Sequence, residues 1–200
     1  MFRRFLLALS AASLTVISPL TAEEKSKGTY FIGSIGTGKM NDIEFAANLG
    51  GGTAEFEPGF SGEIGVGYDF GSFRTEFTYN SLTTALEGAQ NVDVDVTSFL
   101  VSAAYDWRSD KKWQPYIGAG VGSSTIDVNL GTTVGGTTVT AGDDSITTVR
   151  LRAGVNYEVS EDFDVYGELW SQGFDDFTIG LIQFTDVSTT GASLGIRVKL

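Results

Sequence analysis

The chain has 200 residues, of which 42% are hydrophobic, with a mean hydropathy of +0.05 and a formal net charge of -12. It contains no histidine and no cysteine, which excludes histidine-dependent hydrolases, H-E-x-x-H metalloproteases, disulfides, zinc fingers and iron–sulfur clusters. The acidic balance opposes nucleic-acid binding, because contacts with a phosphate backbone need basic patches. Glycine is enriched, with 26 residues and no collagen period.

The N-terminal residues predict export. Arg3 and Arg4 precede an apolar run over residues 5–17, which is followed by Pro19 and a small-residue cleavage site that ends at Ala22. An uncleaved membrane anchor is the alternative, but the run is shorter than the roughly 20 residues of a spanning helix. Cleavage would remove two basic residues and no acidic one, leaving 11 basic against 25 acidic residues.

The resulting organisation has three parts. We predict a signal peptide at 1–22, a short segment at 23–28 and one domain at 29–200. The signal peptide implies that the mature chain is exported.

From Gly28 onward, hydrophobic residues recur with a period of two, which is typical of β-strands. The pattern predicts eight strands, at 30–36, 59–71, 73–80, 99–107, 113–128, 147–158, 163–172 and 187–200. Eight is an even number, as in bacterial single-chain outer-membrane barrels. The predicted fold class is therefore all-β, an eight-stranded antiparallel up-and-down transmembrane β-barrel. Residues 29–200 are then an outer-membrane β-barrel domain, and 23–28 are a short periplasmic segment before it.

The predicted connections alternate in length. Long ones, rich in Gly, Thr, Asn and acidic residues, fall at 37–58, 80–94, 127–145 and 173–186, and short ones fall at 70–72, 107–113 and 158–162. Long extracellular loops and short periplasmic turns give this asymmetry in outer-membrane barrels. In the first short connection, the apolar positions before the turn are even-numbered and those after it are odd. For both apolar sets to lie on one face of the sheet, the residue numbers of each cross-strand pair must sum to an odd number. A turn of even length gives this pairing.

The composition of the two strand faces predicts which face lines the barrel lumen and which faces outward. One face is almost continuously apolar or aromatic, and the other is mainly Gly, Ser and Thr with a few charges. A soluble barrel would carry many exposed Lys and Glu residues, so the polar face is assigned to a narrow lumen. The charges on that face are Glu63, Arg74, Glu76, Arg150, Arg152, Glu168, Arg197 and Lys199.

Aromatic residues gather at the predicted short-turn end, where Trp and Tyr favour the membrane interface. They are Tyr68, Phe70, Phe73, Tyr105, Trp107 and Trp113, with Tyr157 and Phe163 nearby. We interpret them as a partial periplasmic girdle. Ordinary core aromatics are the alternative, because strands are enriched in these residues generally.

Three stretches carry a resemblance to a known family. The segments 62-GEIGVGYDFGSFRTEFTY-79, 113-WQPYIGAGVG-122 and 153-AGVNYEVSEDFDVYGEL-169 resemble the small porin-like outer-membrane β-barrel domains of the OmpA and OmpX transmembrane type. The resemblance covers about residues 28 to 200 and implies outer-membrane lipid and the barrel-assembly machinery as partners.

The resemblance also implies an assembly signal in the last strand. In this chain the matching positions are Ile196, Val198 and Leu200. Family members usually end on an aromatic residue, whereas this chain ends on Leu200, which keeps the apolar character and alters the signal.

The inward charges support two hypotheses about function. Glu63, Arg74, Glu76, Arg150, Arg152, Glu168 and Arg197 form either an ion-pair network that plugs the barrel or a narrow gated pore. A three-residue connection at 159–161 would place Arg152 directly opposite Glu168. Since both signs of charge are present, no ion selectivity follows.

The acidic pairs outside the predicted lumen are further candidate sites. Asp143-Asp144, Asp175-Asp176 and the pair Asp93 and Asp95 could imitate a carboxylate site or bind Ca²⁺ or Mg²⁺, but solvated loops or strand tips are the plainer interpretation. The glycine-rich segment 33–39 lacks the spacing of a phosphate loop. Enzymatic outer-membrane barrels use histidine, which this chain lacks.

The sequence therefore predicts a monomeric, non-enzymatic outer-membrane protein with a structural or surface-interaction role. It would need no cofactor or metal and would carry four acidic extracellular loops. A small low-conductance channel and a secreted soluble barrel that binds an apolar ligand are the alternatives.

Overall fold

A computed structural model describes residues 27–45, 52–88, 92–108, 111–134, 137–179 and 182–200. The predicted signal peptide at 1–22 lies outside the described residues, as does most of the segment at 23–28. No helix in the described part of the chain is long and apolar enough to cross a membrane.

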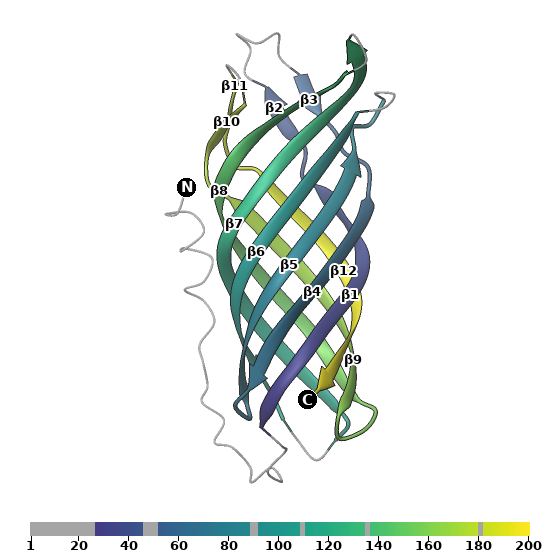
Figure 1. The fold of residues 1–200 in the computed structure, drawn as a ribbon, viewed down its shortest axis with the longest axis vertical. Coiled ribbons are helices and arrows are strands. Elements are labelled where there is room, and N and C mark those ends of the chain that lie inside the picture. The colour runs from purple at the N-terminus through teal and green to yellow at the C-terminus, as the bar shows by residue number, and fades with distance from the viewer. Residues whose placement is uncertain (1–26, 46–51, 89–91, 109–110, 135–136, 180–181) are drawn as a thin grey trace.

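Eight strands form one closed antiparallel barrel (Figure 1). They are β1 (Gly28–Met40), β4 (Gly59–Asp69), β5 (Phe73–Ala85), β6 (Asp93–Asp106), β7 (Trp113–Val134), β8 (Thr137–Glu158), β9 (Phe163–Phe174) and β12 (Ser188–Lys199). Each strand pairs with its neighbour in the chain, and β1 closes the barrel by pairing with both β4 and β12. The predicted fold class is confirmed.

The short hairpin between β4 and β5 has the predicted register. Tyr68 pairs with Thr75, so paired positions sum to an odd number, and the N–H of Phe70 donates to the carbonyl of Phe73 at 2.8 Å. Gly71, inside this turn, has a φ of 111°, a left-handed conformation that favours glycine. The turn residues and the alternation therefore specify the same pairing.

The long connections contain more strand than the sequence predicted. Two small hairpins, β2 (Ile43–Phe45) with β3 (Gly52–Ala54) and β10 (Phe177–Ile179) with β11 (Ile182–Phe184), lie within the predicted loops 37–58 and 173–186. The predicted loop 127–145 is wrong in extent, because β7 continues to Val134 and β8 begins at Thr137. The Gly- and Thr-rich sequence of this segment is typical of a loop, but pairing between β7 and β8 keeps its backbone extended.

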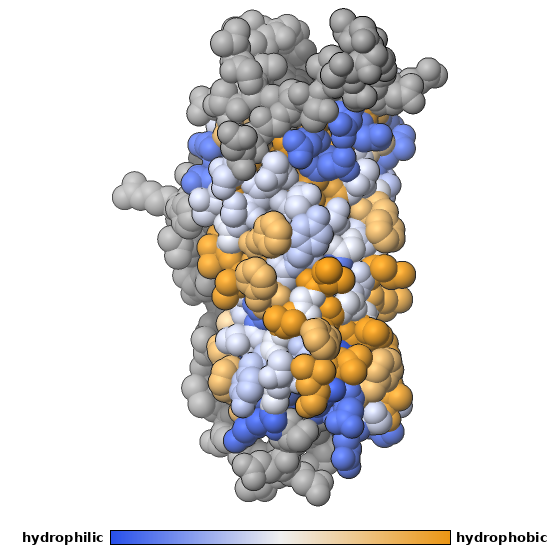
Figure 2. Space-filling view, viewed as in Figure 1, coloured by the Kyte–Doolittle hydropathy of each residue, from blue (hydrophilic) through white to orange (hydrophobic). Residues whose placement is uncertain are grey.

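The outward face carries a band of exposed apolar side chains. Ile64, Leu169 and Leu194 are 65%, 68% and 69% exposed, and Figure 2 shows hydrophobic side chains over the middle and lower barrel with hydrophilic ones toward both ends. Along β6 and the residue that follows it, the band runs over positions 99–107, which is roughly 20 Å along the membrane normal for a tilted strand. The predicted outward direction of the apolar parity is confirmed.

The aromatic residues of the short-turn end face outward, as predicted. Tyr105 contacts Trp107 with ring centroids 5.4 Å apart, and Trp113 contacts Tyr157 at 4.6 Å. Trp107 and Trp113 are both exposed, so these rings lie on the outer wall and not in a core. Such a position suits rings that are apolar at one end and polar at the other.

Above the band the amphipathic pattern inverts. On β6, Asp93 and Asp95 face outward while Val94 and Val96 are buried; further along the strand, exposed Phe99 alternates with buried Ser98. Alternation is continuous through the strand, so the change of polarity occurs without a change of register. On β6 the outer face is therefore apolar below this point, and the inner face is apolar above it.

Candidate functional site

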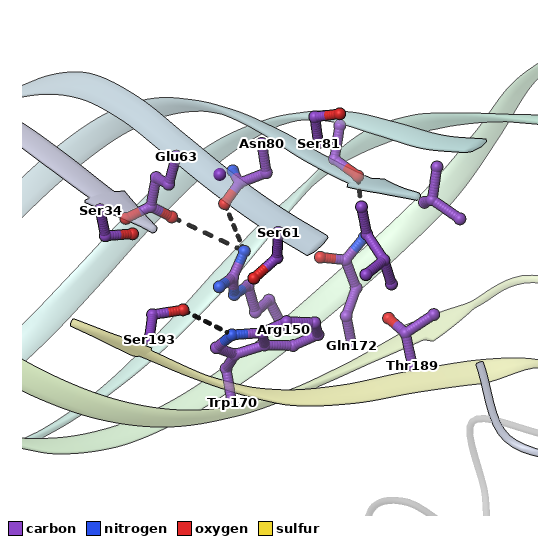
Figure 3. Close-up of a pocket in the computed structure, with 14 residues that line it drawn as sticks. Ser34, Ser61, Glu63, Asn80, Ser81, Arg150, Trp170, Gln172, Thr189 and Ser193 are labelled. Atoms are coloured by element: carbon purple, nitrogen blue, oxygen red, sulfur yellow. Dashed lines mark hydrogen bonds and ion pairs between the residues drawn. The ribbon is translucent and has the colours of Figure 1, made fainter. Parts of the chain in front are cut away.

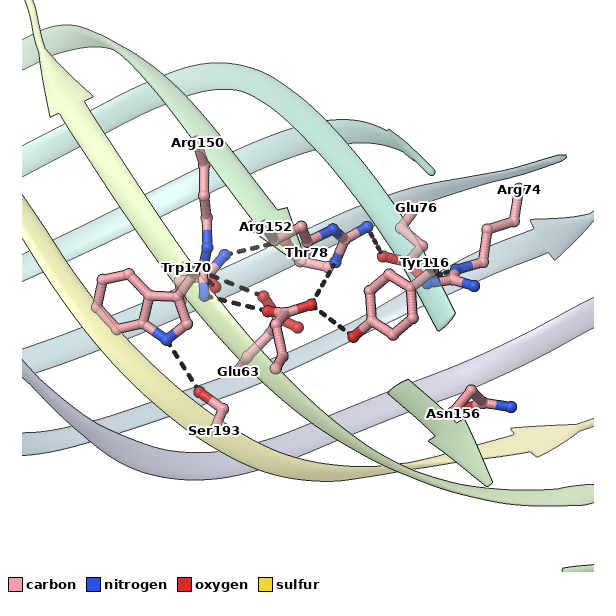
Figure 4. A network of polar contacts seen from close by, with 12 residues as sticks. Glu63, Arg74, Glu76, Thr78, Tyr116, Arg150, Arg152, Asn156, Trp170 and Ser193 are labelled. Atoms are coloured by element: carbon pink, nitrogen blue, oxygen red, sulfur yellow. Dashed lines mark hydrogen bonds and ion pairs between the residues drawn. The ribbon is translucent and has the colours of Figure 1, made fainter. Parts of the chain in front are cut away.

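Of the eight charges predicted on the polar face, seven are buried in the lumen, and Lys199 is partly buried and lines a small cavity at the short-turn end. The seven buried charges come from five strands, with Glu63 on β4, Arg74 and Glu76 on β5, Arg150 and Arg152 on β8, Glu168 on β9 and Arg197 on β12. Alternation places each of them on the inner face, and closure of the barrel brings the distant strands together (Figure 4).

Glu76 is the centre of the network. Its Oε1 accepts hydrogen bonds from the Tyr30 hydroxyl at 2.6 Å and from Nε of Arg74 at 3.0 Å. Its Oε2 accepts from Nη2 of Arg152, and Nε of Arg197 lies 3.7 Å from Oε1. One carboxylate is thus shared by three buried guanidinium groups, which compensate its desolvation.

A second group lies beside it, around Glu168. Nη2 of Arg150 is 3.7 Å from Oε1 of Glu168, and Nη1 of Arg152 is 3.8 Å from its Oε2. The Tyr116 hydroxyl also donates to Oε2 at 2.8 Å. Glu63 joins through Arg150, with Oε2 and Nη1 3.6 Å apart. Arg152 therefore links the two groups into one network.

The predicted register of the β8–β9 hairpin is wrong. Arg152 pairs with Trp170, and Glu168 pairs with Gly154. The hydrogen bond from the N–H of Val159 to the carbonyl of Phe163 centres the turn one residue later than predicted, so each partner shifts by two positions. A shift of two keeps every side chain on its face. Arg152 and Glu168 meet diagonally instead of directly across.

The mouth of the barrel at the short-turn end adds three charges that the sequence did not predict as part of the site. Arg74 also pairs with Asp106, and Arg108 donates through Nη2 to Asp69 and lies 3.8 Å from Asp106. Asp69 and Asp106 continue the inward parity to the ends of β4 and β6, which is a signal that the sequence offered. Arg108 comes from the short connection at 107–113, and only the folded chain shows that it contributes to the network.

The network is formally neutral. Its ion pairs join five arginines to five carboxylates, namely Arg74, Arg108, Arg150, Arg152 and Arg197 with Glu63, Asp69, Glu76, Asp106 and Glu168. Balance matters here because an uncompensated buried charge is strongly destabilising.

Aromatic rings complete the arginine environment. The guanidinium of Arg74 lies 4.3 Å from the ring centroid of Tyr116, that of Arg197 lies 4.2 Å from Tyr166, and that of Arg150 lies 4.5 Å from Trp170. Cation–π contacts of this kind gain strength when both groups are desolvated.

The same rings account for several lumen glycines. A Cβ added to Gly154 would lie 2.4 Å from the carbonyl oxygen of Gly167 and 2.7 Å from Cζ of Tyr116, and one added to Gly38 would lie 2.7 Å from the Trp170 ring. A side chain at Gly38 would displace the ring, and one at Gly154 would displace both the ring and the backbone of the neighbouring strand. Part of the glycine excess therefore serves close packing of aromatic rings against the barrel wall.

An apolar cap fills the lumen above the charges. Its buried members are Met40, Phe56, Leu82, Val94, Val96, Ile126, Ile146, Trp170, Phe174, Phe177 and Val187. Phe177 comes from β10 and stacks on Phe184 of β11, with ring centroids 5.2 Å apart. The sequence analysis missed this cap. Its signal was the inverted alternation at 93–96, where valines take the inward parity.

Little free space remains in the described lumen. One polar cavity of about 20 Å³ lies between the network and the cap and is lined by Ser61, Glu63, Asn80, Arg150 and Trp170, among others (Figure 3). A second, of about 10 Å³, lies at the mouth of the barrel at the short-turn end. Volumes of this size suit about one water molecule each.

The acidic residues of the long connections do not form a metal site within the described residues. No group of three or more His, Cys, Asp or Glu side chains is arranged there to hold a metal ion. On the outer wall, the Asp95 carboxylate accepts from the Thr83 hydroxyl at 2.5 Å and from the Asn129 amide at 2.8 Å. The Asp95 oxygens thus have hydrogen-bond donors from neighbouring strands.

The predicted assembly-signal residues lie on the outer face of the closing strand. Ile196 and Val198 are exposed on β12, which pairs with β1 and β9. Leu200 is exposed, and its N–H donates to the carbonyl of Thr29 at 3.0 Å.

Comparison with known proteins identifies the family. The outer membrane protein beta-barrel domain family matches residues 5–199. The chain belongs to this family. Membership places the barrel in the bacterial outer membrane, and it excludes the secreted soluble barrel, which the exposed apolar band also contradicts.

Solved structures of outer-membrane barrels share the fold. Neisserial surface protein A is similar with a TM-score of 0.65 at 22% identity, covering 86% of this chain and 97% of that one. OprG from Pseudomonas aeruginosa gives 0.58 at 12% identity, covering 90% and 100%. Ail of Yersinia pestis, in complex with the heparin analogue sucrose octasulfate, gives 0.50 at 15%, covering 86% and 99%. No curated protein sequence matches the chain.

Proposed function

We propose that this family member is a closed, non-enzymatic barrel whose task is to hold acidic hairpins at the cell surface. The observation that carries the proposal is the double closure of the lumen, with a neutral ion-pair network in the membrane and an apolar cap above it.

Opening such a lumen has a large energetic cost. An ion path would have to separate buried pairs such as Arg152 with Glu76, and breaking one buried pair costs roughly 3–5 kcal/mol. The same path would have to hydrate the apolar cap, whose members Val94, Val96 and Ile126 are at most 4% exposed. The two barriers lie in series, and this supports a closed barrel over a low-conductance channel.

The lumen is also poorly suited to proton-transfer chemistry. The carboxylates of Glu76 and Glu168 are each engaged by arginines and by a tyrosine hydroxyl. The described lumen cavities, of about 20 and 10 Å³, also leave no room for a substrate beside these carboxylates. This supports a scaffold without catalytic activity.

A planar-bilayer recording tests the proposal. We expect the purified, refolded barrel to give no discrete current steps at any voltage, while a known porin under the same conditions gives them. Reproducible steps that scale with protein amount and vanish on heat unfolding would overturn the closed-barrel proposal in favour of the small channel.

A further inference from the structure

β7 and β8 continue above the rest of the barrel as a two-stranded ribbon (Figure 1). β6 pairs with β7 only as far as Asn129, and β9 pairs with β8 only as far as Thr148, whereas β8 itself begins at Thr137. The carbonyl of Thr147 accepts the N–H of Asp175 at 2.9 Å. Beyond that point β8 has β7 on one side only.

The other edge of β8 has no ladder partner in the described part of the chain. β10 comes near β8, but its strand pairing is with β11. Over residues 137–146, this edge therefore presents backbone N–H and C=O groups that no second strand takes up. A free strand edge is a template for another extended backbone.

The charge around this edge has one sign. The connections at the long-loop end and the strand tips beside them carry thirteen acidic residues, namely Asp42, Glu44, Glu55, Glu57, Glu87, Asp93, Asp95, Asp127, Asp143, Asp144, Asp175, Asp176 and Asp186. Lys39 is the single basic residue at this end. Asp143 and Asp144 belong to the free edge itself, and Asp175 and Asp176 follow β9 where the free edge begins.

Charge and edge together define the partner. A second copy would bring the same excess of acidic residues to the contact, so like-charge repulsion opposes edge-to-edge pairing of two copies. An extended segment with a surplus of Lys or Arg would gain both the main-chain hydrogen bonds and the electrostatic attraction.

We propose that the free edge of β8, over residues 137–146, binds an extended, positively charged polypeptide segment of another protein as an added strand. The inference rests on the proposed function, because it assigns the surface role to one edge and one chemistry of partner.

The test uses the whole barrel in nanodiscs of zwitterionic lipid, with empty nanodiscs as the blank. The probe is a synthetic peptide of about ten residues that alternates Lys and Val. A matched peptide carries N-methyl groups on alternate amides, which keeps the charge and removes one side of the hydrogen-bond ladder. We expect the parent peptide to bind at least about tenfold more tightly than the methylated one. Hydrogen exchange should slow at amides within 137–146.

A pair of matched variants separates local from general electrostatics. Asp143→Asn with Asp144→Asn removes two charges from the edge, and Glu55→Gln with Glu57→Gln removes two charges beside β4, which three barrel strands separate from β8. We expect a several-fold loss of affinity for the first pair and a clearly smaller loss for the second. Equal binding of the two peptides, equal losses for the two variant pairs, or protection outside 137–146 would overturn the proposal.

Two further outcomes are also decisive. Concentration-dependent dimerisation with protection of 137–146 and no peptide binding would assign the edge to a second copy and reject the cationic partner. Absence of peptide binding together with silent bilayers would remove the edge proposal and leave the closed barrel standing, whereas conductance would remove the closed barrel whatever the peptide does.

Discussion

Replacing Glu76 with glutamine tests the energetic role of the lumen network. Glu76→Gln keeps the shape of the side chain and removes the charge that Arg74, Arg152 and Arg197 share. In this variant Arg74 keeps its ion pair with Asp106, and Arg152 keeps its ion pair with Glu168. Within the described residues, the ion pair of Arg197 is with Glu76, and the substitution removes it. An arginine left buried without a counter-charge costs roughly 3–5 kcal/mol.

A loss of this size is a large share of the roughly 5–15 kcal/mol by which folded domains are stable. Equilibrium urea unfolding in phospholipid vesicles, followed by tryptophan fluorescence and by heat-modifiable gel migration, measures it. We expect a lower transition midpoint with an unchanged slope, since the surface exposed on unfolding stays the same. Glu57→Gln, on an exposed side chain, should change stability by less than about 0.5 kcal/mol.

The double variant Glu76→Gln with Arg152→Gln distinguishes charge balance from simple loss of contacts. It restores equal numbers of arginines and carboxylates in the network, so the two changes should couple favourably by about 1–3 kcal/mol. If Glu76→Gln costs less than about 1 kcal/mol, or if the double variant is merely additive, the reasoning from buried charge balance is refuted.

Three further predictions concern the wall, the lipid face and the orientation. Gly154→Ala, facing a tyrosine ring, should destabilise by about 1–3 kcal/mol, whereas Gly33→Ala, which has 3.9 Å of clearance on the outer wall, should be nearly neutral by urea unfolding. Val101→Lys, on the apolar band, should cost about 2–4 kcal/mol in the same assay, and Thr97→Lys, just above the band, about 0–1 kcal/mol. On intact cells, a glutamate-specific protease should cut the barrel while trypsin, limited to Lys39 in β1, should leave it largely whole.

Each of these has a distinct contrary result. Equal costs for the two glycine variants would mean that close packing against the ring and the adjacent strand does not fix the glycine at 154. A tolerated lysine at Val101 would argue against lipid contact there. Trypsin cleavage within the charged turn at 108–112 on intact cells would invert the orientation, because that turn is expected in the periplasm.

Much of the site could be predicted because a barrel wall makes side-chain direction a matter of parity. Glu63, Arg74 and Glu168 needed only alternation to be placed in the lumen. Their partners were harder to predict. The turn centre between β8 and β9 was off by one residue, which moved Arg152 from a direct to a diagonal contact with Glu168. Turn geometry depends on local backbone conformation that Val-Ser-Glu-Asp does not specify strongly.

The apolar cap was missed for a related reason. Val94 and Val96 lie in a short polar stretch that reads as loop, and their inward direction becomes visible only once β6 is known to continue through it. The same holds for Arg108, which follows the end of β6 and returns to Asp69 across the barrel mouth.

The sequence by itself determined the compartment expectation, the strand number, the face of each strand and the location of the acidic excess, because these follow from period-two alternation and composition. Only the tertiary structure decided that Glu76 binds three arginines, that tyrosine rings pack against glycines, and that β8 extends beyond its pairing with β9. These features depend on which strands face each other across the closed lumen and on where each strand pairing stops. Both are set by the register of the strands and by barrel closure. Alternation does not determine the register, because a shift of two residues leaves every side chain on the same face.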